Sequence, residues 1–207
     1  AESVRSGIGE RAARVRAAGG VVRLDAVLSC PGDSPARVYA ENQARTCEAL
    51  GIDYVLHELG GGCTLEEAKG CVRRLNEDEG VVAIMVHMPL PEGVDAYPVQ
   101  RLIDPEKDVE GVNPANIGNI VYGRSSLAPC TGLAAVRMVE STGVELRGAR
   151  CVVVGASNVV GKPIAVLLMR RDATVVSCNE WTWGLEELCA SADVLVSAVG
   201  KPGLIRP

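Results

Sequence analysis

Apolar runs of strand length alternate with helix-like segments along most of the chain, and this alternation limits the fold more than any other feature. Strands and helices are expected to alternate in the first half at residues 21–28, 36–50, 52–59, 64–76 and 81–88. After a helix at 131–141, they alternate again at residues 150–154, 159–170, 173–177, 185–190 and 194–199. Strands joined through helical crossovers pair in parallel. The sequence therefore predicts an α/β fold with two α/β domains.

The two halves are separated by residues 104–123, a stretch rich in proline, glycine and asparagine that shows no long periodic segment. Such connecting segments are typical of domain boundaries and of active-site walls. We place the boundary inside it, giving domains of residues 1–118 and 119–207. The Arg- and Ala-rich residues 1–20 lack the apolar centre of a secretory signal and favour an amphipathic helix.

Composition excludes several classes of protein. Hydrophobic residues make up 47% of the 207 residues and Phe is absent, so the core must be aliphatic, which suits buried parallel strands. The net charge of -5 without a basic patch argues against nucleic acid. No apolar run approaches the roughly 20 residues that cross a bilayer, so no membrane partner is expected. The eight cysteines show no CxxC spacing, which favours reduced thiols in a cytoplasmic protein and no metal site.

A glycine-rich break interrupts the second half at residues 151–163, CVVVGASNVVGKP. A helix that begins after a strand offers free N–H groups and a positive dipole end to a phosphate. Gly155 and Gly161 would let the backbone approach a ligand closely, Ser157 would add a hydroxyl donor, and Pro163 fits a first helical turn. The spacing is not GxGxxG, so both a dinucleotide site and an ordinary strand-to-helix turn remain open.

The end of the following strand, VSCNEWT at 176–182, bears on cofactor choice. In dinucleotide folds this position lies at the adenosine ribose. Glu180 would accept hydrogen bonds from ribose hydroxyls and repel a 2′-phosphate, and the segment contains no Lys or Arg to bind that phosphate. The alternative is that Glu180 is a solvated loop carboxylate. If a dinucleotide binds, the segment favours NAD over NADP.

Five motifs occur in a specific order: PLP at 89–91, DPEKDVEG at 104–111, PCT at 129–131, GASNVVGKP at 155–163 and AVGKPG at 198–203. On these motifs the chain resembles the methylenetetrahydrofolate dehydrogenase/cyclohydrolase (FolD) family over nearly its whole length. The resemblance implies a homodimer, with a folate-binding catalytic domain and a Rossmann-like NAD(P)-binding domain flanking a cleft. It also implies oxidation of 5,10-methylenetetrahydrofolate with NADP or NAD. In most members hydrolysis of the methenyl product to 10-formyltetrahydrofolate follows.

The resemblance assigns folate-site residues by position. Tyr39 matches the tyrosine that packs on the pterin, and Gln43 stands where the family has its catalytic lysine. His87 replaces a glutamine that usually bonds the lysine, and Glu110 replaces the aspartate at the pterin edge. The remaining substrate-binding residues implied are Pro89, Leu90, Pro91 and Thr131.

The resemblance also assigns the cofactor site. Trp181 stands where NADP-using members tend to have an arginine, and Glu180 lies beside it. The residues implied for the cofactor loop are Gly155, Ala156, Ser157, Asn158, Val160, Gly161 and Pro163.

The departures from the family cluster at the folate site. Lysine changes charge and suits proton chemistry, whereas glutamine does not, so Gln43 predicts weak or lost cyclohydrolase with hydride transfer retained. His87 is either a substitute titratable group or a polar neighbour of Gln43, and we favour the second. Members usually continue past the last motif, so a fragment or a reduced member is expected. Two alternatives stay open: an ordinary bifunctional enzyme using NADP, and a degenerate or repurposed member without turnover.

Overall fold

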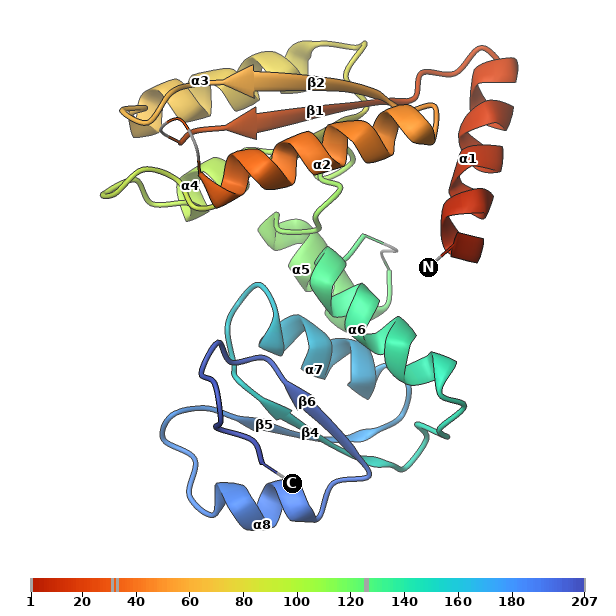
Figure 1. The fold of residues 1–207 in the computed structure, drawn as a ribbon, viewed down its shortest axis with the longest axis vertical. Coiled ribbons are helices and arrows are strands. Elements are labelled where there is room, and N and C mark those ends of the chain that lie inside the picture. The colour runs from red at the N-terminus through yellow and green to blue at the C-terminus, as the bar shows by residue number, and fades with distance from the viewer. Residues whose placement is uncertain (1, 31, 33, 125–126, 207) are drawn as a thin grey trace. The chain divides into compact units, whose positions relative to one another are not determined.

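The computed structural model describes residues 2–30, 32, 34–124 and 127–206. The chain forms two compact units, Ala1–Val109 and Glu110–Pro207 (Figure 1). Each unit has a three-stranded parallel sheet covered by helices, which confirms the predicted pair of α/β domains.

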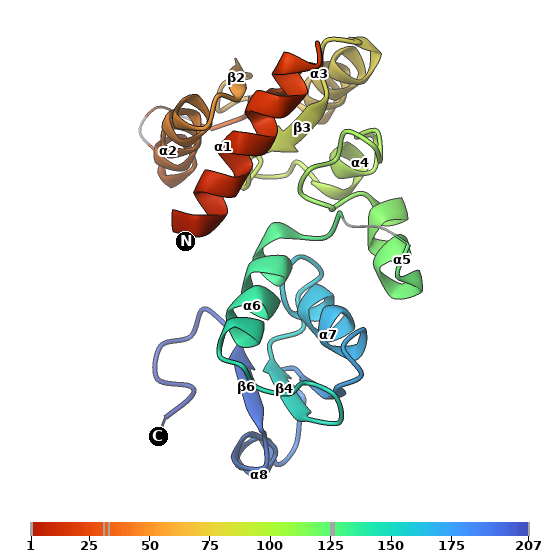
Figure 2. The same cartoon turned by 90° about the vertical axis from the view of Figure 1, so that its right-hand side faces the viewer.

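The first unit is built around strand β1 (Arg23–Leu28), which lies between β2 (Asp53–Glu58) and β3 (Ala83–Val86) in the order β2-β1-β3. Helices α2 (Pro35–Ala49) and α3 (Leu65–Glu77) lie on opposite faces of this sheet, as Figures 1 and 2 show. A short helix, α4 (Tyr97–Gln100), packs beside α3. Strand β1 is therefore central: the chain passes from it to β2 on one side and then crosses to β3 on the other.

Local sequence explains where these two long helices begin. Ser34 caps α2, its hydroxyl accepting a hydrogen bond from the Arg37 N–H at 3.2 Å. Thr64 and Glu67 form a capping box at the start of α3: the Thr64 hydroxyl accepts from the Glu67 N–H, and the Glu67 carboxylate accepts from the Thr64 N–H. Each cap satisfies donors that the first helical turn leaves without a partner.

Helix α1 (Glu2–Ala17) occupies the segment expected to be an amphipathic helix. Arg16 ties its last turn to the start of β2, through the carbonyl of Gly51 at 3.0 Å and the carboxylate of Asp53 at 2.7 Å. Among its described side chains only Ala12 is buried, and Val4 and Val15 are exposed. The helix therefore contributes little to the core.

The second unit repeats the strand order, with β4 (Arg150–Val154) between β5 (Thr174–Cys178) and β6 (Val194–Ser197). Helix α7 (Gly161–Met169) covers one face, and α8 (Leu185–Ala190) lies on the other (Figure 2). Helices α5 (Pro114–Tyr122) and α6 (Cys130–Ser141) pack against α7. The core on the α7 face is aliphatic, as the composition predicted.

No long periodic segment is expected in residues 104–123, and the structure places the nine-residue helix α5 within them. The side chain of Asn113 accepts from the Ala115 N–H at 2.8 Å, Pro114 occupies the first turn, and Gly123 ends the helix with a φ of +68°. These are ordinary start and stop signals that composition alone obscured. The predicted boundary at 118/119 falls inside α5, whereas the units divide at Val109 and Glu110. The reason is that Ile120 is buried in the core of the second unit.

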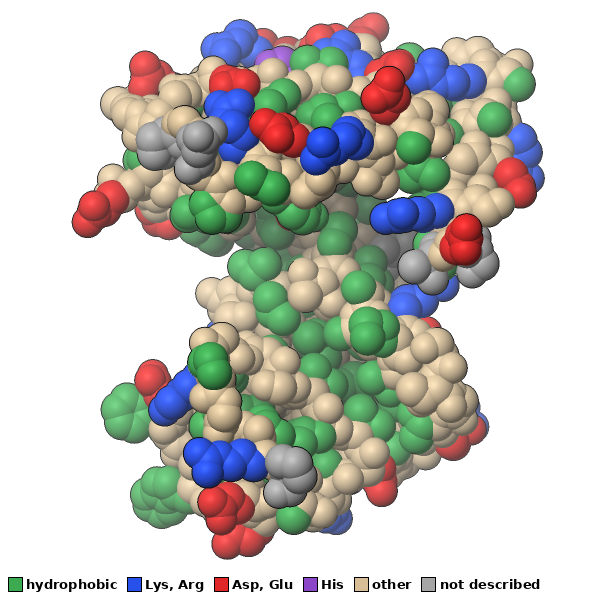
Figure 3. Space-filling model, viewed as in Figure 1, with side chains coloured by type: hydrophobic (Ala, Val, Ile, Leu, Met, Phe, Trp, Pro, Cys, Tyr) green, Lys and Arg blue, Asp and Glu red, His purple; other side chains and the backbone are tan. Residues whose placement is uncertain are grey.

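The surface carries both signs of charge. Figure 3 shows Lys and Arg side chains interspersed with Asp and Glu side chains over one face of each unit. Within the described residues, none of the helices combines the length and apolar character that crossing a membrane requires.

Candidate active site

Ligands of open parallel sheets bind at the carboxyl ends of the strands, where chain connections diverge from the central strand. In this protein β1 and β4 are the central strands. Ligand-binding residues are therefore expected directly after these strands and after their neighbours. The predicted site residues after strands occupy these positions: His87 follows β3, Gly155 follows β4 and Glu180 follows β5.

In the first unit, α2 and the end of β3 bring together Tyr39, Gln43 and His87. The rings of Tyr39 and His87 meet edge to face, with centroids 5.6 Å apart and planes at 78°. The Gln43 side-chain N–H donates to the Met85 sulfur at 3.0 Å, while its Oε1 is buried without a hydrogen-bond partner. Tyr39 is itself 56% exposed, which leaves ring surface for a ligand.

His87 lies at the centre of this cluster and is 3% exposed. The backbone N–H of His87 donates to the carbonyl of Val27 at 2.8 Å, which holds this residue beside β1. Its Nε2 lies 3.2 Å from the hydroxyl of Tyr54, a residue that the sequence did not single out. Burial lowers the pKa of His87, and burial also raises the pKa of Tyr54 to about 12. The cluster is therefore uncharged at neutral pH.

The segment after His87 turns away through the predicted Pro-Leu-Pro motif. The peptide bond between Met88 and Pro89 is cis. Leu90 is buried and anchors the segment, while Pro89 is exposed and Pro91 is partly exposed. The motif thus presents proline surface beside the His87 cluster.

In the second unit, the segments containing Glu110 and Thr131 come close together. A Cβ added at Gly111, whose φ is +65°, would lie 2.6 Å from the backbone of Ala128. This approach places the DVEG segment against the residues that lead into α6. Thr131 is exposed in the first turn of α6, and Glu110 is partly exposed.

The glycines of the second unit's loop are required by close backbone approach. Gly155 has a φ of +107°, and a Cβ there would lie 2.6 Å from the carbonyl oxygen of Ala198. A Cβ at Gly161 would overlap the carbonyl oxygen of Gly155 and lie 2.7 Å from its carbonyl carbon. The Gly155 N–H donates to the Cys178 carbonyl at 2.9 Å, which fixes the loop at the end of β5. The close approaches within the loop explain both glycines without a ligand. The loop also leads into the amino end of α7, the kind of position that suits a phosphate.

The side chains of this loop are partly engaged with one another. The Ser157 hydroxyl oxygen accepts from the N–H groups of Val160 at 3.2 Å and Gly161 at 3.4 Å. The expectation of free N–H groups therefore does not hold for these two, although the Ser157 hydroxyl keeps its own hydrogen to donate. Asn158 accepts from Lys162 at 2.7 Å. Ala156 is partly exposed and Pro163 is buried in the first turn of α7.

The loop after β5 is a compact turn that exposes its tip. The side chain of Asn179 accepts from the Trp181 N–H at 2.9 Å, and the Thr182 hydroxyl accepts from the Asn179 N–H at 2.8 Å. Glu180 is exposed, Trp181 is 78% exposed and Trp183 is 93% exposed. A rigid turn with exposed acidic and aromatic side chains suits contact with a ribose and an adenine.

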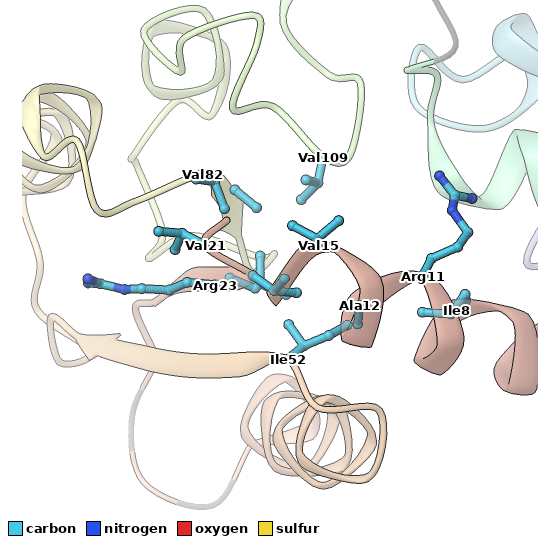
Figure 4. Close-up of a pocket in the computed structure, with 12 residues that line it drawn as sticks. Ile8, Arg11, Ala12, Val15, Val21, Arg23, Ile52, Val82 and Val109 are labelled. Atoms are coloured by element: carbon cyan, nitrogen blue, oxygen red, sulfur yellow. The ribbon is translucent and has the colours of Figure 1, made fainter. Parts of the chain in front are cut away.

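Two other features of the first unit lie away from this chemistry. His57 contacts the fully buried Asp25 at 2.7 Å, and Arg23 pairs with the same carboxylate at 2.8 Å, which raises the pKa of Arg23. A mostly aliphatic cavity of about 460 Å³ lies between α1 and the amino ends of the strands (Figure 4). Its lining includes Ile8 and Val82, at the edge of the sheet opposite the carboxyl ends. Among the described residues, no cluster of three or more His, Cys, Asp or Glu could hold a metal ion.

Comparisons with known proteins agree with these two units. The tetrahydrofolate dehydrogenase/cyclohydrolase catalytic domain model matches residues 1–110, and the NAD(P)-binding domain model of the same family matches residues 129–207. The chain is 40% identical over 206 residues to bifunctional protein FolD of Moorella thermoacetica, covering 99% of this chain and 73% of that protein. It is 38% identical to FolD of Acetivibrio thermocellus, covering 87% of this chain and 64% of that relative's length.

Among solved structures, the bifunctional enzyme FolD from Campylobacter jejuni aligns with a TM-score of 0.94 at 30% identity. The alignment covers 99% of this chain and 73% of that one. Both halves of the sequence and both units of the structure are accounted for by one family. The chain belongs to the tetrahydrofolate dehydrogenase/cyclohydrolase family, with a catalytic domain followed by an NAD(P)-binding domain.

Proposed function

We propose that this chain oxidises 5,10-methylenetetrahydrofolate to 5,10-methenyltetrahydrofolate with NAD, and that its cyclohydrolase activity is weak or lost. The observation that carries the proposal is the neutral cluster around Gln43. The position that holds a lysine in the family holds an amide here, and its neighbour His87 is buried with a lowered pKa. No charged group replaces the lysine among the described contacts of these two residues.

Hydride transfer depends mainly on holding two molecules in a reactive orientation. In the proposed roles, the exposed ring of Tyr39 stacks on the pterin, Glu110 binds its polar edge, and Pro89–Pro91 shape the folate pocket. Residues Gly155–Gly161 hold the dinucleotide pyrophosphate through the turn and the positive end of α7. Bound NAD supplies the hydride acceptor. None of these steps requires a side chain to gain or lose a proton.

Hydrolysis of the methenyl product makes a different demand, because water must be activated and protons moved. An amide side chain cannot accept or release a proton near neutral pH. Gln43 therefore lines the one-carbon position without acting as acid or base. This separates the two activities by their chemistry.

The proposed preference for NAD rests on the turn after β5. In this proposal Glu180 binds the ribose hydroxyls, and its charge opposes a 2′-phosphate. We expect Trp181→Arg to strengthen NADP binding by about tenfold or more, because a charge-assisted hydrogen bond contributes roughly 1.5–3 kcal/mol. Trp183→Arg, at the neighbouring 93% exposed tryptophan, is the matched control.

The test measures dissociation constants for NAD and NADP with each variant. Stronger NADP binding in Trp181→Arg alone supports the assignment of this turn to the ribose. Equal effects in the two variants would mean that a general gain of positive charge, and not a specific site, changed binding.

We also propose that the protein works as a homodimer in the cytoplasm. The dimer rests on the family resemblance. The proposed compartment rests on the spacing of the cysteines, which shows no CxxC pattern and suits reduced thiols.

A further inference from the structure

We propose that Tyr54 is a positioning residue that fixes His87 as a neutral imidazole with its proton on Nδ1. In this arrangement the Tyr54 hydroxyl donates to His87 Nε2, and His87 offers its remaining N–H as a hydrogen-bond donor. His87 then serves as a polar neighbour of Gln43 and not as a substitute for the family's lysine. Only this last chemical consequence rests on the proposed function.

The geometry begins with the sheet order β2-β1-β3. Tyr54 lies on β2 and His87 follows β3, so their side chains connect the two outer strands on the face covered by α2. Their 3.2 Å separation allows one hydrogen bond, in which either the phenol or the imidazole is the donor. The direction of that bond decides the tautomer.

Counting hydrogen-bonding groups favours the phenol as donor. If His87 Nε2 carried the proton and donated, two groups would lack partners among the described contacts: the Tyr54 hydroxyl hydrogen and Gln43 Oε1. If Tyr54 donates, only the acceptor on Gln43 Oε1 remains, since His87 Nδ1 is not one of the buried atoms without a partner. Buried polar groups without partners are costly, so the second arrangement is preferred.

Gln43 Oε1 can accept a hydrogen bond, and in the proposed tautomer His87 Nδ1–H can donate one. A ligand that offers a donor to the amide oxygen and an acceptor to the imidazole N–H would satisfy both. The site would thus recognise a neutral polar edge and would disfavour a fixed charge.

The surroundings keep both partners in these protonation states. The ionisable groups that contact His87 or lie behind its partner are Tyr39 and Cys47 on α2 and Tyr54 on β2. Phenols and thiols are uncharged at neutral pH. Burial lowers the pKa of His87 and raises the pKa of both Tyr54 and Cys47, so nothing in this group favours an imidazolium.

The test is nitrogen-15 NMR of the imidazole rings between pH 5.5 and 8. The chain has two histidines, so the signal missing from His87→Gln identifies His87 in the wild type. We expect Nε2 in the pyridine-type range, Nδ1 in the pyrrole-type range, and no titration near pH 6.5. Tyr54→Phe should shift the ring toward the Nε2–H tautomer and raise its titration midpoint. Tyr39→Phe removes the hydroxyl of the other tyrosine that contacts the His87 ring. It should change neither the tautomer nor the titration midpoint of His87.

Two results would overturn the inference: a pyrrole-type Nε2 in the wild type, or unchanged His87 nitrogen shifts in Tyr54→Phe. The measurement needs neither folate nor dinucleotide. A protein with the expected tautomer but no turnover would contradict the proposed function alone. A protein that reduces NAD but has the opposite tautomer would contradict this inference alone.

Discussion

Replacing Gly161 with alanine tests whether the loop after β4 is a rigid element of the dinucleotide site. A Cβ at this position would overlap the Gly155 carbonyl oxygen and lie 2.7 Å from its carbon. Carbon atoms normally pack about 3.5–4.0 Å apart, so relieving the overlap would require the loop to move by about 1 Å or more. Gly155 cannot retreat easily, because its N–H is bonded to Cys178 and its own α-carbon faces the Ala198 carbonyl.

Such overpacking costs about 1–3 kcal/mol, reduced by the better helix propensity of alanine. We therefore expect Gly161→Ala to lower the free energy of unfolding by about 1–2 kcal/mol and to weaken NAD binding at least tenfold. Circular dichroism in urea measures the first quantity. Quenching of Trp181 and Trp183 fluorescence, both exposed near the proposed adenosine site, measures the second.

Gly118→Ala is the matched control, because Gly118 lies in α5 and a Cβ there meets nothing within 4 Å. It should leave NAD binding unchanged and stabilise the protein by up to about 1 kcal/mol. If Gly161→Ala binds NAD and unfolds like the wild type, the loop is not the rigid turn described above, and its assignment to the pyrophosphate loses its structural basis.

Two further predictions concern stability. Thr64→Ala should lower the free energy of unfolding in urea by about 1 kcal/mol because it removes the cap of α3, while Thr64→Ser should be nearly neutral. Equal losses in the two variants would show that the hydroxyl does not stabilise the helix. Because the pKa of His87 is lowered in the folded protein, only the unfolded chain protonates this imidazole just below pH 6.5. The free energy of unfolding should therefore fall as the pH drops below 6.5, by at most about 1.4 kcal/mol per pH unit. His87→Gln should flatten the plot of unfolding free energy against pH just below pH 6.5. An unchanged slope in this variant would show that His87 is not the source of the pH dependence.

Much of the architecture follows from local sequence signals. The strand predicted at 150–154 and the helix predicted at 185–190 have the same bounds in the structure, because each is a short regular segment with clear breakers on both sides. Helix α5 was missed because the composition of its region suggested a loop. Its start at Asn113-Pro114 and its stop at Gly123 are nevertheless ordinary helix boundary signals.

The details of the site were less accessible. Gly155 and Gly161 could be singled out because their spacing after a strand has a local meaning. The contact between Tyr54 and His87 joins residues 33 positions apart across a sheet, and no periodicity in the sequence reports which side chains meet there. The orphaned oxygen of Gln43 likewise depends on packing against Met85. Family resemblance identifies positions, whereas hydrogen-bond partners at altered positions require the structure.

The central claim is that hydride transfer survives at this site without the proton chemistry of the missing lysine. It is tested most directly by following reduced cofactor and methenyl product together, with 5,10-methylenetetrahydrofolate and either NAD or NADP. The account predicts reduction of NAD, little reduction of NADP, and methenyl product that disappears only at its spontaneous rate, with faster hydrolysis in Gln43→Lys. Rapid consumption of the methenyl product by the unaltered protein, or no turnover with either cofactor, would contradict it.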